Sequence, residues 1–514
     1  MNWSYAPDPQ VRNLPELVQR RMKSPEKVFI RNGDGRTFTY FDIWALAGQM
    51  ANALAAQGVK TGDRVAIQAE KSPEAITLFL ACAKLGAVYL PLNTAYTIAE
   101  VDYFLGDAEP SALIVMPERL DTLADLAGRR NVSALLSLGT KGEGTFMDAT
   151  RRQTCGFTDA KVEWSDLAAI LYTSGTTGRS KGAMLTHGNL ASNALSLIDT
   201  WRFSERDVLI HALPVYHTHG LFTATNTLLL SAGTMLFRQK FDADDVMRLM
   251  PEATTMMGVP TFYTRLLQHP GLIREATAHM RLFISGSAPL LAETHREFRE
   301  RTGHAILERF GMTETNMNTS NPYDGERIAG TVGLPLPGVD VRISDPGSGT
   351  PLPAGEIGMI EVRGPNVFKG YWRMPEKTAA EFRPDGFFIT GDLGRIDDNG
   401  YVSIVGRGKD LIITGGFNVY PKEVESEIDS LDGIVESAVI GLPHPDFGEG
   451  VTAVVVRSGN DLLEREILRR LEDRLAKFKL PKQVIFVDDL PRNAMGKVQK
   501  NVLRQAYADL YRQT

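Results

Sequence analysis

The sequence predicts an α/β protein: a large N-terminal domain of layered α/β subdomains plus a β-rich unit, followed by a small, mobile α+β C-terminal domain. Helix-like and strand-like patterns alternate over residues 27–160 and again over residues 167–307. After Gly333 the pattern changes to short strand-like segments separated by dense Gly and Pro. A third pattern, with both kinds of element, starts after Lys409. Together these observations predict layered α/β subdomains, a β-rich unit and a separate C-terminal unit.

The first predicted elements alternate between helix and strand. Apolar residues recur at helical spacing over residues 41–55, and the helix they predict ends near Gly58. A second, buried helix is predicted over residues 75–85. Short apolar runs predict strands over residues 64–67, 88–92 and 112–116. Because strands alternate with helices, we expect a mostly parallel sheet that is covered on both faces.

The later elements predict two smaller units. The β-rich unit contains predicted strands over residues 339–343, 357–362 and 401–405. The C-terminal unit contains a predicted helix over residues 422–428 and predicted strands over residues 411–413, 437–440 and 451–456. A long amphipathic helix is predicted from the one-sided spacing of Leu463, Ile467, Leu468, Leu471 and Leu475. We place the boundary near Lys409, which gives domains over residues 1–408 and 409–514.

Composition excludes several classes of protein. The 514-residue chain has a formal net charge of −6, which argues against a general nucleic-acid binder. Its two cysteines, Cys82 and Cys155, are too few for a disulfide framework or a cysteine-rich metal site. The apolar run from Ala75 to Ala83 is too short to span a bilayer, and the first residues show no secretion signal. We therefore expect a cytoplasmic enzyme with neither a nucleic-acid nor a membrane partner.

The stretch over residues 170–182 is the most informative. A strand runs into a loop made almost wholly of Gly, Ser and Thr, which ends at Lys181. Glycines let backbone N–H groups turn toward an anion, and hydroxyls add donors, so this composition is typical of a phosphate site. It is not a Walker A loop, because Ser180 occupies the second Gly position and Gly182 follows the lysine. A flexible surface linker is the alternative.

Five motifs in order carry a resemblance to a known family. Residues 172–182 are similar to the phosphate loop of the adenylate-forming superfamily, which includes acyl-CoA synthetases, peptide-synthetase adenylation domains and firefly-type luciferases. The other motifs cover residues 310–314, 390–392, 406–410 and 491–497. The resemblance spans essentially the whole chain. One departure is Phe310, where the family usually has Tyr; stacking on adenine is retained, but a contact through the hydroxyl is lost.

The resemblance implies activation of a carboxylate by ATP, in which two anions must meet and cations must offset their repulsion. Thr313 then contacts the α-phosphate, Glu314 holds Mg²⁺, and Lys497 bridges the carboxylate and the α-phosphate. Asp392 and Arg407 match ribose contacts, with a structural ion pair as the alternative. The implied ATP/AMP-binding residues are Thr173, Ser174, Gly175, Thr176, Thr177, Gly178, Lys181, Arg309, Phe310, Gly311, Met312, Asp392 and Arg407.

The resemblance also implies a moving C-terminal lid that carries Lys497. Lys409 matches the hinge, and Gly415, Gly416 and Phe417 match the segment that lines the path of CoA. A plain β-turn is an alternative for that segment. Lys497 could be an ordinary solvated lysine; if it is catalytic, a lysine acetyltransferase acting on it would silence the enzyme.

The acyl pocket is predicted from two polar segments. Its candidate residues are His217, Thr218, Ser285, Gly286, Ser287 and Arg296, with His217 also a catalytic candidate. The pair His217 and His219 lacks a third ligand at suitable spacing, so a metal site is disfavoured. A second substrate carboxylate needs a buried cation, for which we expect Arg296, assisted by His217 and Thr218. An outward-facing Arg296 in a charge-rich helix is an equal alternative.

Residues 90–96, 216–222 and 313–323 are closely similar to bacterial malonyl-CoA synthetases. The resemblance therefore implies ligation of malonate, and also methylmalonate, to CoA through a malonyl-adenylate, with release of AMP and pyrophosphate. Mg²⁺ is the implied cofactor, and ATP and CoA are the co-substrates. Two alternatives stay open: a short- or medium-chain acyl-CoA synthetase, and a free-standing adenylation enzyme that loads a carrier protein. A nucleotide-binding regulator is disfavoured, because binding alone would not require both Lys181 and Lys497.

Overall fold

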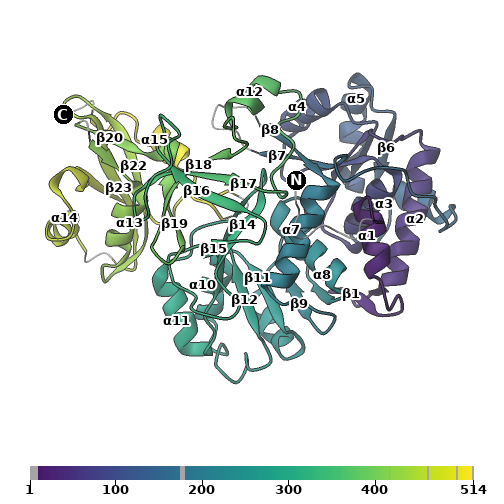
Figure 1. Cartoon of the computed structure of the whole chain (residues 1–514), viewed down its shortest axis with the longest axis horizontal. Helices are drawn as coiled ribbons and strands as arrows, with labels where there is room; N and C mark the ends of the chain where they lie inside the picture. The colour runs from purple at the N-terminus through teal and green to yellow at the C-terminus, as the bar shows by residue number, and fades with distance from the viewer. Residues whose placement is uncertain (1–9, 174–179, 416, 460–461, 494–495, 512–514) are drawn as a thin grey trace.

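A computed structural model describes residues 10–173, 180–415, 417–459, 462–493 and 496–511. The chain folds into a large N-terminal lobe and a small C-terminal lobe, which is drawn in yellow-green at one end of the molecule (Figure 1). The large lobe contains two mostly parallel sheets and one antiparallel sheet, and the small lobe contains a fourth sheet. This arrangement confirms the predicted mixed α/β class with a large first domain and a small second one.

The first mostly parallel sheet has the strand order β6-β5-β3-β4-β7-β8. Its strands are β3 (Arg64–Gln68), β4 (Val88–Pro91), β5 (Ala112–Val115), β6 (Ala134–Ser137), β7 (Leu167–Thr173) and β8 (Lys181–Thr186). All pairs are parallel except β7 with β8. Helices α2 (Tyr40–Ala56) and α3 (Pro73–Leu85) pack on one face, and α4 (Ile98–Ala108) and α5 (Leu120–Arg129) on the other. The predicted two-sided cover is confirmed.

The second sheet has the order β15-β14-β13-β12-β11-β9-β10-β1-β2. Its strands are β1 (Val28–Asn32), β2 (Thr37–Thr39), β9 (Val208–His211), β10 (Thr234–Phe237), β11 (Thr255–Gly258), β12 (Leu282–Ser285), β13 (Leu307–Met312), β14 (Asn316–Ser320) and β15 (Leu334–Pro335). Its helices are α1 (Leu14–Arg21), α6 (Thr145–Arg151), α7 (His187–Thr200), α8 (Thr225–Ser231), α9 (Ala243–Leu249), α10 (Pro260–Gln268) and α11 (Ala292–Thr302), of which α6 packs on the first sheet. Helices α9, α10 and α11 cover one face, and α7 and α8 lie between the two large sheets.

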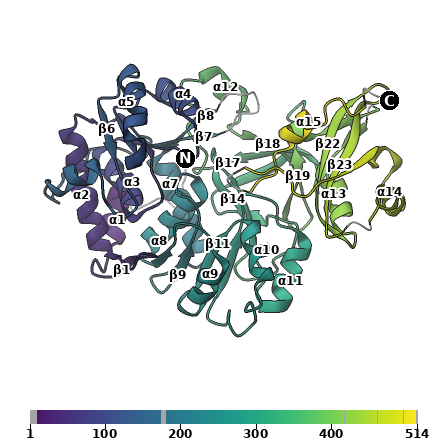
Figure 2. The same cartoon turned by 180° about the vertical axis from the view of Figure 1, so that it is seen from behind.

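The β-rich unit is an antiparallel sheet in the order β16-β17-β18-β19. Its strands are β16 (Asp340–Ser344), β17 (Gly358–Arg363), β18 (Phe388–Ile396) and β19 (Val402–Arg407). Helix α12 (Pro375–Ala380) precedes β18 and lies beside α4 in both views (Figures 1 and 2). Trp372 just before α12 anchors this contact, because its indole N–H donates to the carbonyl of Asp107 at 3.1 Å.

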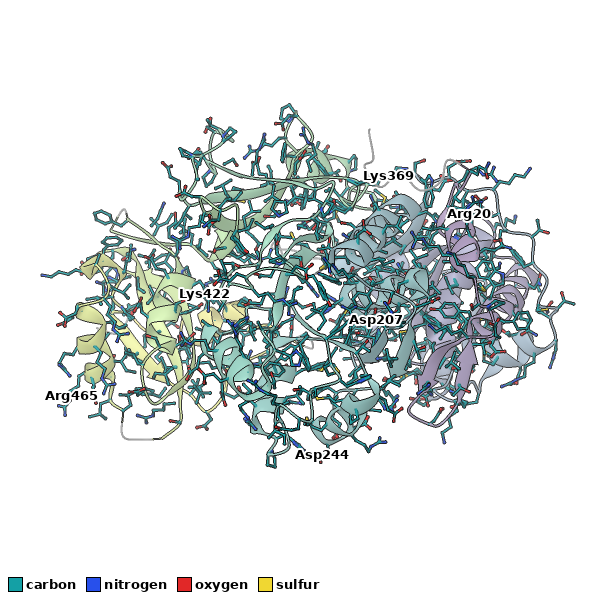
Figure 3. The ribbon with its side chains drawn as sticks, turned by 60° about the horizontal axis from the view of Figure 1, so that its bottom comes forward. Arg20, Asp207, Asp244, Lys369, Lys422 and Arg465 are labelled. Carbon is teal, nitrogen blue, oxygen red and sulfur yellow. The ribbon has the colours of Figure 1, made fainter. Side chains whose placement is uncertain are left out.

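A short 3₁₀ turn, Gly408–Asp410, leads from β19 into the small lobe, where the boundary was predicted. The lobe contains β20 (Ile412–Thr414), β21 (Phe417–Val419), β22 (Ile434–His444), β23 (Gly448–Arg457), β24 (Gln483–Phe486), α13 (Pro421–Asp429), α14 (Glu464–Glu472) and α15 (Lys500–Ala506). Helices α13 and α14 cover one face of its sheet and α15 the other. Figure 3 places Lys422 of α13 where the two lobes meet and Arg465 of α14 at the outer edge.

Most predicted elements are confirmed within one or two residues, but one prediction needs correction and one strand was not predicted. The amphipathic helix is short: α14 ends at Glu472, Leu463 is its exposed N-cap, and Leu475 lies beyond it. Strand β18 was not predicted, because Gly391 and Gly394 interrupt its alternation. Within the described part of the chain, every helix is too short or too polar to cross a membrane.

Candidate active site

Lys181 opens strand β8 at the edge of the first sheet. Strands β7 and β8 form an antiparallel hairpin in which Thr173 lies opposite Lys181, so the predicted phosphate loop joins two paired strands. Five of the predicted loop residues lie outside the described residues: Ser174, Gly175, Thr176, Thr177 and Gly178. The Lys181 ammonium is buried, lies 3.1 Å from Glu381 Oε1, and sits 4.0 Å above the Tyr371 ring.

The turn between β13 and β14 presents Thr313 and Glu314. Gly311 allows this turn, because a Cβ there would lie 2.0 Å from the carbonyl oxygen of Asn316. The buried Glu314 carboxylate accepts hydrogen bonds at Oε1 from the hydroxyls of Tyr371 at 3.1 Å and Thr173 at 3.4 Å. Both of these donors are neutral hydroxyls, so neither hydrogen bond brings a cation to the carboxylate.

Asp392 and Arg407 face each other on β18 and β19. Arg407 Nε lies 2.6 Å from Asp392 Oδ1. Burial raises the pKa of the Asp392 carboxyl, and the nearby Arg407 acts in the opposite direction. The second oxygen, Oδ2, has no hydrogen-bond partner among the described residues. The two residues therefore form an ion pair and still present one free oxygen, which suits a ribose hydroxyl.

Lys497 reaches the large lobe from a turn in the small lobe. The backbone N–H of Asn493 donates to the carbonyl of Lys497, and the N–H of Lys497 donates to Asn493 Oδ1, both at 3.0 Å. Burial, followed by the charge of Arg407, lowers the pKa of Lys497, while Asp392 and Glu314 act in the opposite direction. The side chain is nevertheless exposed to solvent. Lys497 therefore lies near charged groups of the large lobe while its side chain stays open to solvent.

The predicted acyl segment leads into a π-helical turn, η2 (His219–Ala224), a feature frequent at functional sites. The N–H of His219 donates to His217 Nδ1 at 3.3 Å, which leaves the proton of a neutral His217 ring on Nε2. Burial, then the nearby Lys497 and Arg309, lower the pKa of His217 to about 3, so the ring is neutral at pH 7. His217 can therefore donate a hydrogen bond to an anion without titrating.

Two further polar groups complete this pocket wall. Thr218 is buried and donates to Asn316 Oδ1 at 3.1 Å, which ties the acyl segment to β14. Ser287 lies 3.1 Å from His219 Nδ1 and adopts a left-handed φ of 72°, a strained backbone for a serine. Ser285 at the end of β12 is buried, and its hydroxyl has no hydrogen-bond partner among the described residues.

Arg309 is a buried cation for which the described residues supply no anionic partner. Its side chain lies on β13 and the residue is 4% exposed. Neither Nε nor Nη2 has a hydrogen-bond partner in the described part of the chain. Its guanidinium packs on Gly286, where a Cβ would lie 2.3 Å from Cζ. Burial lowers the pKa of Arg309, which is the electrostatic consequence of leaving this charge uncompensated.

The structure does not bring Arg296 to this pocket. Helix α11 turns Thr294, His295 and Phe298 inward, and Arg296 is exposed on the opposite face. The prediction that Arg296 meets a second substrate carboxylate is therefore wrong, and its outward-facing alternative is the observed one. Arg309, which the resemblance grouped with the nucleotide-binding residues, lies beside Gly286 and His217.

The residues predicted to form the hinge and to line the path of CoA lie at the start of the small lobe. Lys409 is exposed within the 3₁₀ turn, and the next residue, Asp410, pairs with Arg504 at 2.5 Å. Gly415, with φ of 56°, lies between the hairpin strands β20 and β21, so the turn alternative also holds. Phe417 is exposed and stacks on Phe478 at 4.8 Å. Gly416 lies outside the described residues.

Sequence reasoning missed Tyr371 and Glu381, which link Lys181 to Glu314. The one local signal is the adjacent aromatic pair Tyr371 and Trp372, and nothing in the sequence around Glu381 distinguishes it from other carboxylates. No group of three or more metal-ligating side chains occurs among the described residues. Glu314 alone fits Mg²⁺, which commonly binds one or two carboxylates together with substrate phosphates.

Comparison with known proteins settles the family. A family model described as AMP-binding enzyme matches residues 17–372, and one described as AMP-binding enzyme C-terminal domain matches residues 423–497. The chain belongs to the AMP-binding enzymes. This result confirms the resemblance to adenylate-forming enzymes that the five motifs indicated.

The names of similar AMP-binding enzymes indicate different acid substrates. The crystal structure of ATP-bound MatB from Rhodopseudomonas palustris is 61% identical, with a TM-score of 0.95, and the match covers 97% of this chain and 100% of that one. A feruloyl-CoA synthase from an Amycolatopsis species is 38% identical over 95% of this chain and 98% of its own length. A malonate–CoA ligase from Arabidopsis thaliana is 34% identical over 92% of this chain and 85% of its own.

Replacing Gly311 by Ala tests the turn that carries Glu314. We expect Gly311→Ala to lower the thermal unfolding midpoint, because overpacking against backbone costs about 1–3 kcal/mol. Gly128→Ala is the matched control: it lies inside α5 with open space around a Cβ, so it should stabilise by about 0.5–1 kcal/mol. Scanning calorimetry of both variants measures the two opposite shifts, and an unchanged midpoint for Gly311→Ala would contradict the close approach.

Proposed function

We propose that the protein is an AMP-forming acid–CoA ligase that converts malonate, and also methylmalonate, to the CoA thioester through an acyl-adenylate. ATP and CoA are its co-substrates, and AMP and pyrophosphate are released. The malonate-ligating relative and the close match to MatB support this assignment at the level of the whole chain. The acid is chosen by the pocket, so the geometry around His217 and Arg309 carries the argument.

The unpaired guanidinium of Arg309 is the single observation that favours a dicarboxylate. An isolated buried charge is costly, whereas a charge that meets an oppositely charged group with good hydrogen bonds is stabilised. A monocarboxylate uses its only carboxylate in the reaction and leaves Arg309 unpaired. Malonate has a second carboxylate, which can accept two hydrogen bonds from one guanidinium. A planar aromatic acid such as ferulate offers no such charge in this position.

The remaining residues fit the first half-reaction. Lys497 offsets the repulsion between the substrate carboxylate and the α-phosphate as the carboxylate attacks the α-phosphorus. Thr313 contacts the α-phosphate. His217 donates a hydrogen bond from its Nε2–H to an anionic oxygen. The ring stays neutral at pH 7, because the pKa of His217 is far below 7. Asp392 accepts from a ribose hydroxyl with the oxygen that Arg407 leaves free. Glu314 holds Mg²⁺, which supplies charge compensation on phosphate oxygens when bound.

The second half-reaction needs the small lobe to move. We assign residues 1–408 to the nucleotide- and acyl-binding domain and residues 409–514 to a lid that carries Lys497. A hinge absorbs backbone rotation at a few residues, and Gly406 and Gly408 flank the exposed Lys409. Rotation there withdraws Lys497 and brings Gly415 and Phe417 toward the acyl-adenylate, where CoA enters.

Exchange of ATP with labelled pyrophosphate tests the substrate. We expect exchange with malonate and methylmalonate, and at most weak exchange with acetate or hexanoate, because only the dicarboxylates compensate Arg309. Exchange with hexanoate but not malonate would indicate a general acyl-CoA synthetase. Adding CoA to the malonate reaction should then yield malonyl-CoA; exchange without any thioester would indicate an enzyme that loads a carrier protein.

Substitution of Arg309 tests the pocket itself. Arg309→Met keeps an unbranched apolar stem and removes the guanidinium charge, so we expect kcat/KM for malonate to fall by about 100-fold, the scale of a lost buried ion pair. Weak activity toward a monocarboxylate of similar size should rise in relative terms. Arg296→Met is the matched control, and its kinetics should stay close to those of the unsubstituted enzyme. The reverse pattern would restore the original Arg296 assignment.

Acetylation of Lys497 should switch the enzyme off. Lys497 is exposed, so a lysine acetyltransferase can reach it, and acetylation removes the charge that adenylation needs. We expect pyrophosphate exchange to fall in proportion to the fraction of Lys497 that mass spectrometry finds acetylated, and to recover on deacetylation. Full exchange by protein that is completely acetylated at Lys497 would refute this role.

A further inference from the structure

The lysine that opens β8 is held by an acidic residue that the reaction scheme does not use. Lys181 Nζ lies 3.1 Å from Glu381 Oε1, and the two side chains are 9% and 19% exposed. At this burial the pair is poorly screened by solvent, so each charge strongly offsets the other. An anion that needs Lys181 must therefore compete with Glu381.

Backbone pairing fixes Glu381 relative to Lys181. The segment over residues 368–372 adds to the edge of β8, since Met184 N–H donates to the Gly370 carbonyl at 3.0 Å and Trp372 N–H to the Gly182 carbonyl at 2.7 Å. Helix α12 follows at once, and Glu381 is its C-cap, with its N–H bonded to the Thr378 carbonyl at 3.1 Å. The pairing of Lys181 with Glu381 is thus built into the fold.

Glu381 is ionised in this setting. Burial raises the pKa of the carboxyl, but Lys377 at 2.8 Å, the Tyr371 hydroxyl at 2.6 Å and Lys181 together lower the pKa below its ordinary value. Glu381 therefore presents a full negative charge beside Lys181 at pH 7. It can hold the ammonium when no phosphate is bound.

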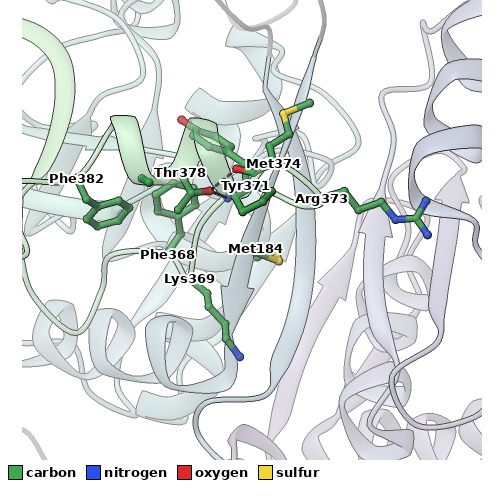
Figure 4. Close-up of a pocket in the computed structure, with 10 residues that line it drawn as sticks. Met184, Phe368, Lys369, Tyr371, Arg373, Met374, Thr378 and Phe382 are labelled. Carbon is green, nitrogen blue, oxygen red and sulfur yellow. Dashed lines mark hydrogen bonds between the residues drawn. The ribbon is translucent and has the colours of Figure 1, made fainter.

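Tyr371 couples this pair to Glu314. Its hydroxyl lies 2.6 Å from Glu381 Oε2 and 3.1 Å from Glu314 Oε1, but it has one hydrogen to donate, so only one carboxylate receives it at a time. Tyr371 also lines an open pocket of about 640 Å³, together with Thr378 and Phe382 among others (Figure 4).

We propose that Glu381 is a positioning residue that holds Lys181 when no polyphosphate is bound, yields it to the leaving phosphates of ATP, and takes it back as pyrophosphate departs. The inference rests on the proposed function in two respects: pyrophosphate is the product, and Lys181 contacts its phosphates. Because Glu381 offsets the charge of Lys181, it lowers the affinity of the enzyme for pyrophosphate. Pyrophosphate is therefore released faster.

The test measures binding of magnesium pyrophosphate by titration calorimetry, without acid or CoA. Glu381→Gln keeps the shape and removes the charge, so we expect pyrophosphate to bind about three- to tenfold tighter. Glu376→Gln, an exposed carboxylate on the same helix, is the matched control and should leave the affinity unchanged. In a Lys181→Met background, Glu381→Gln should give no tightening. Equal affinity for Glu381→Gln and unsubstituted enzyme, or tightening that persists without Lys181, would overturn the proposal.

A second measurement needs no variant. Crystal structures of the unsubstituted enzyme with and without magnesium pyrophosphate should show Lys181 Nζ beyond about 4 Å from Glu381 Oε1 when pyrophosphate is bound, and paired when it is absent. A pair that stays intact with pyrophosphate in place would overturn the proposal. Both measurements omit the acid, so a failure of malonate as substrate leaves them interpretable.

Discussion

The site depends on one constraint: ATP, the reacting carboxylate and a distal carboxylate are all anions, so the protein must hold cations whose charge is still available. The structure does this in three ways. Lys181 and Arg407 are held by carboxylates, Lys497 keeps access to solvent on a separate lobe, and Arg309 is buried with no anionic partner among the described residues. Only the last arrangement costs stability until a substrate anion binds, and for this reason we propose that Arg309 selects the acid.

The fold brings these cations together from distant parts of the chain. Arg309 comes from a central strand of the second sheet, Lys181 from the edge of the first sheet, and Lys497 from the small lobe. Close backbone approaches make the pocket possible: Gly286 leaves space for the Arg309 guanidinium, and Gly311 permits the turn that presents Glu314. Side chains added at these glycines would displace the groups that the chemistry needs.

Much of the fold could be predicted from periodicity, because buried helices and strands such as α3 and β4 have long apolar runs. Strand β18 could not, since its glycines remove the alternating signal. The motifs identified Glu314, Asp392 and Lys497 as site residues, and the charges of Asp392 and Glu314 both act on Lys497 in the structure. The direction of Arg296, in contrast, was decided by tertiary packing. A signal was available: Thr294, His295 and Phe298 share a helical face that excludes Arg296. The role of Arg309 emerges only from its surroundings in three dimensions.

A crystal structure with AMP and malonate tests the central claim most directly, because it shows which cation meets the carboxylate that does not react. The account predicts that its oxygens lie about 3 Å from Nε and Nη2 of Arg309, with His217 within hydrogen-bonding distance of the substrate. A malonate whose distal carboxylate faces solvent or another cation, with Arg309 still unpaired, would contradict it.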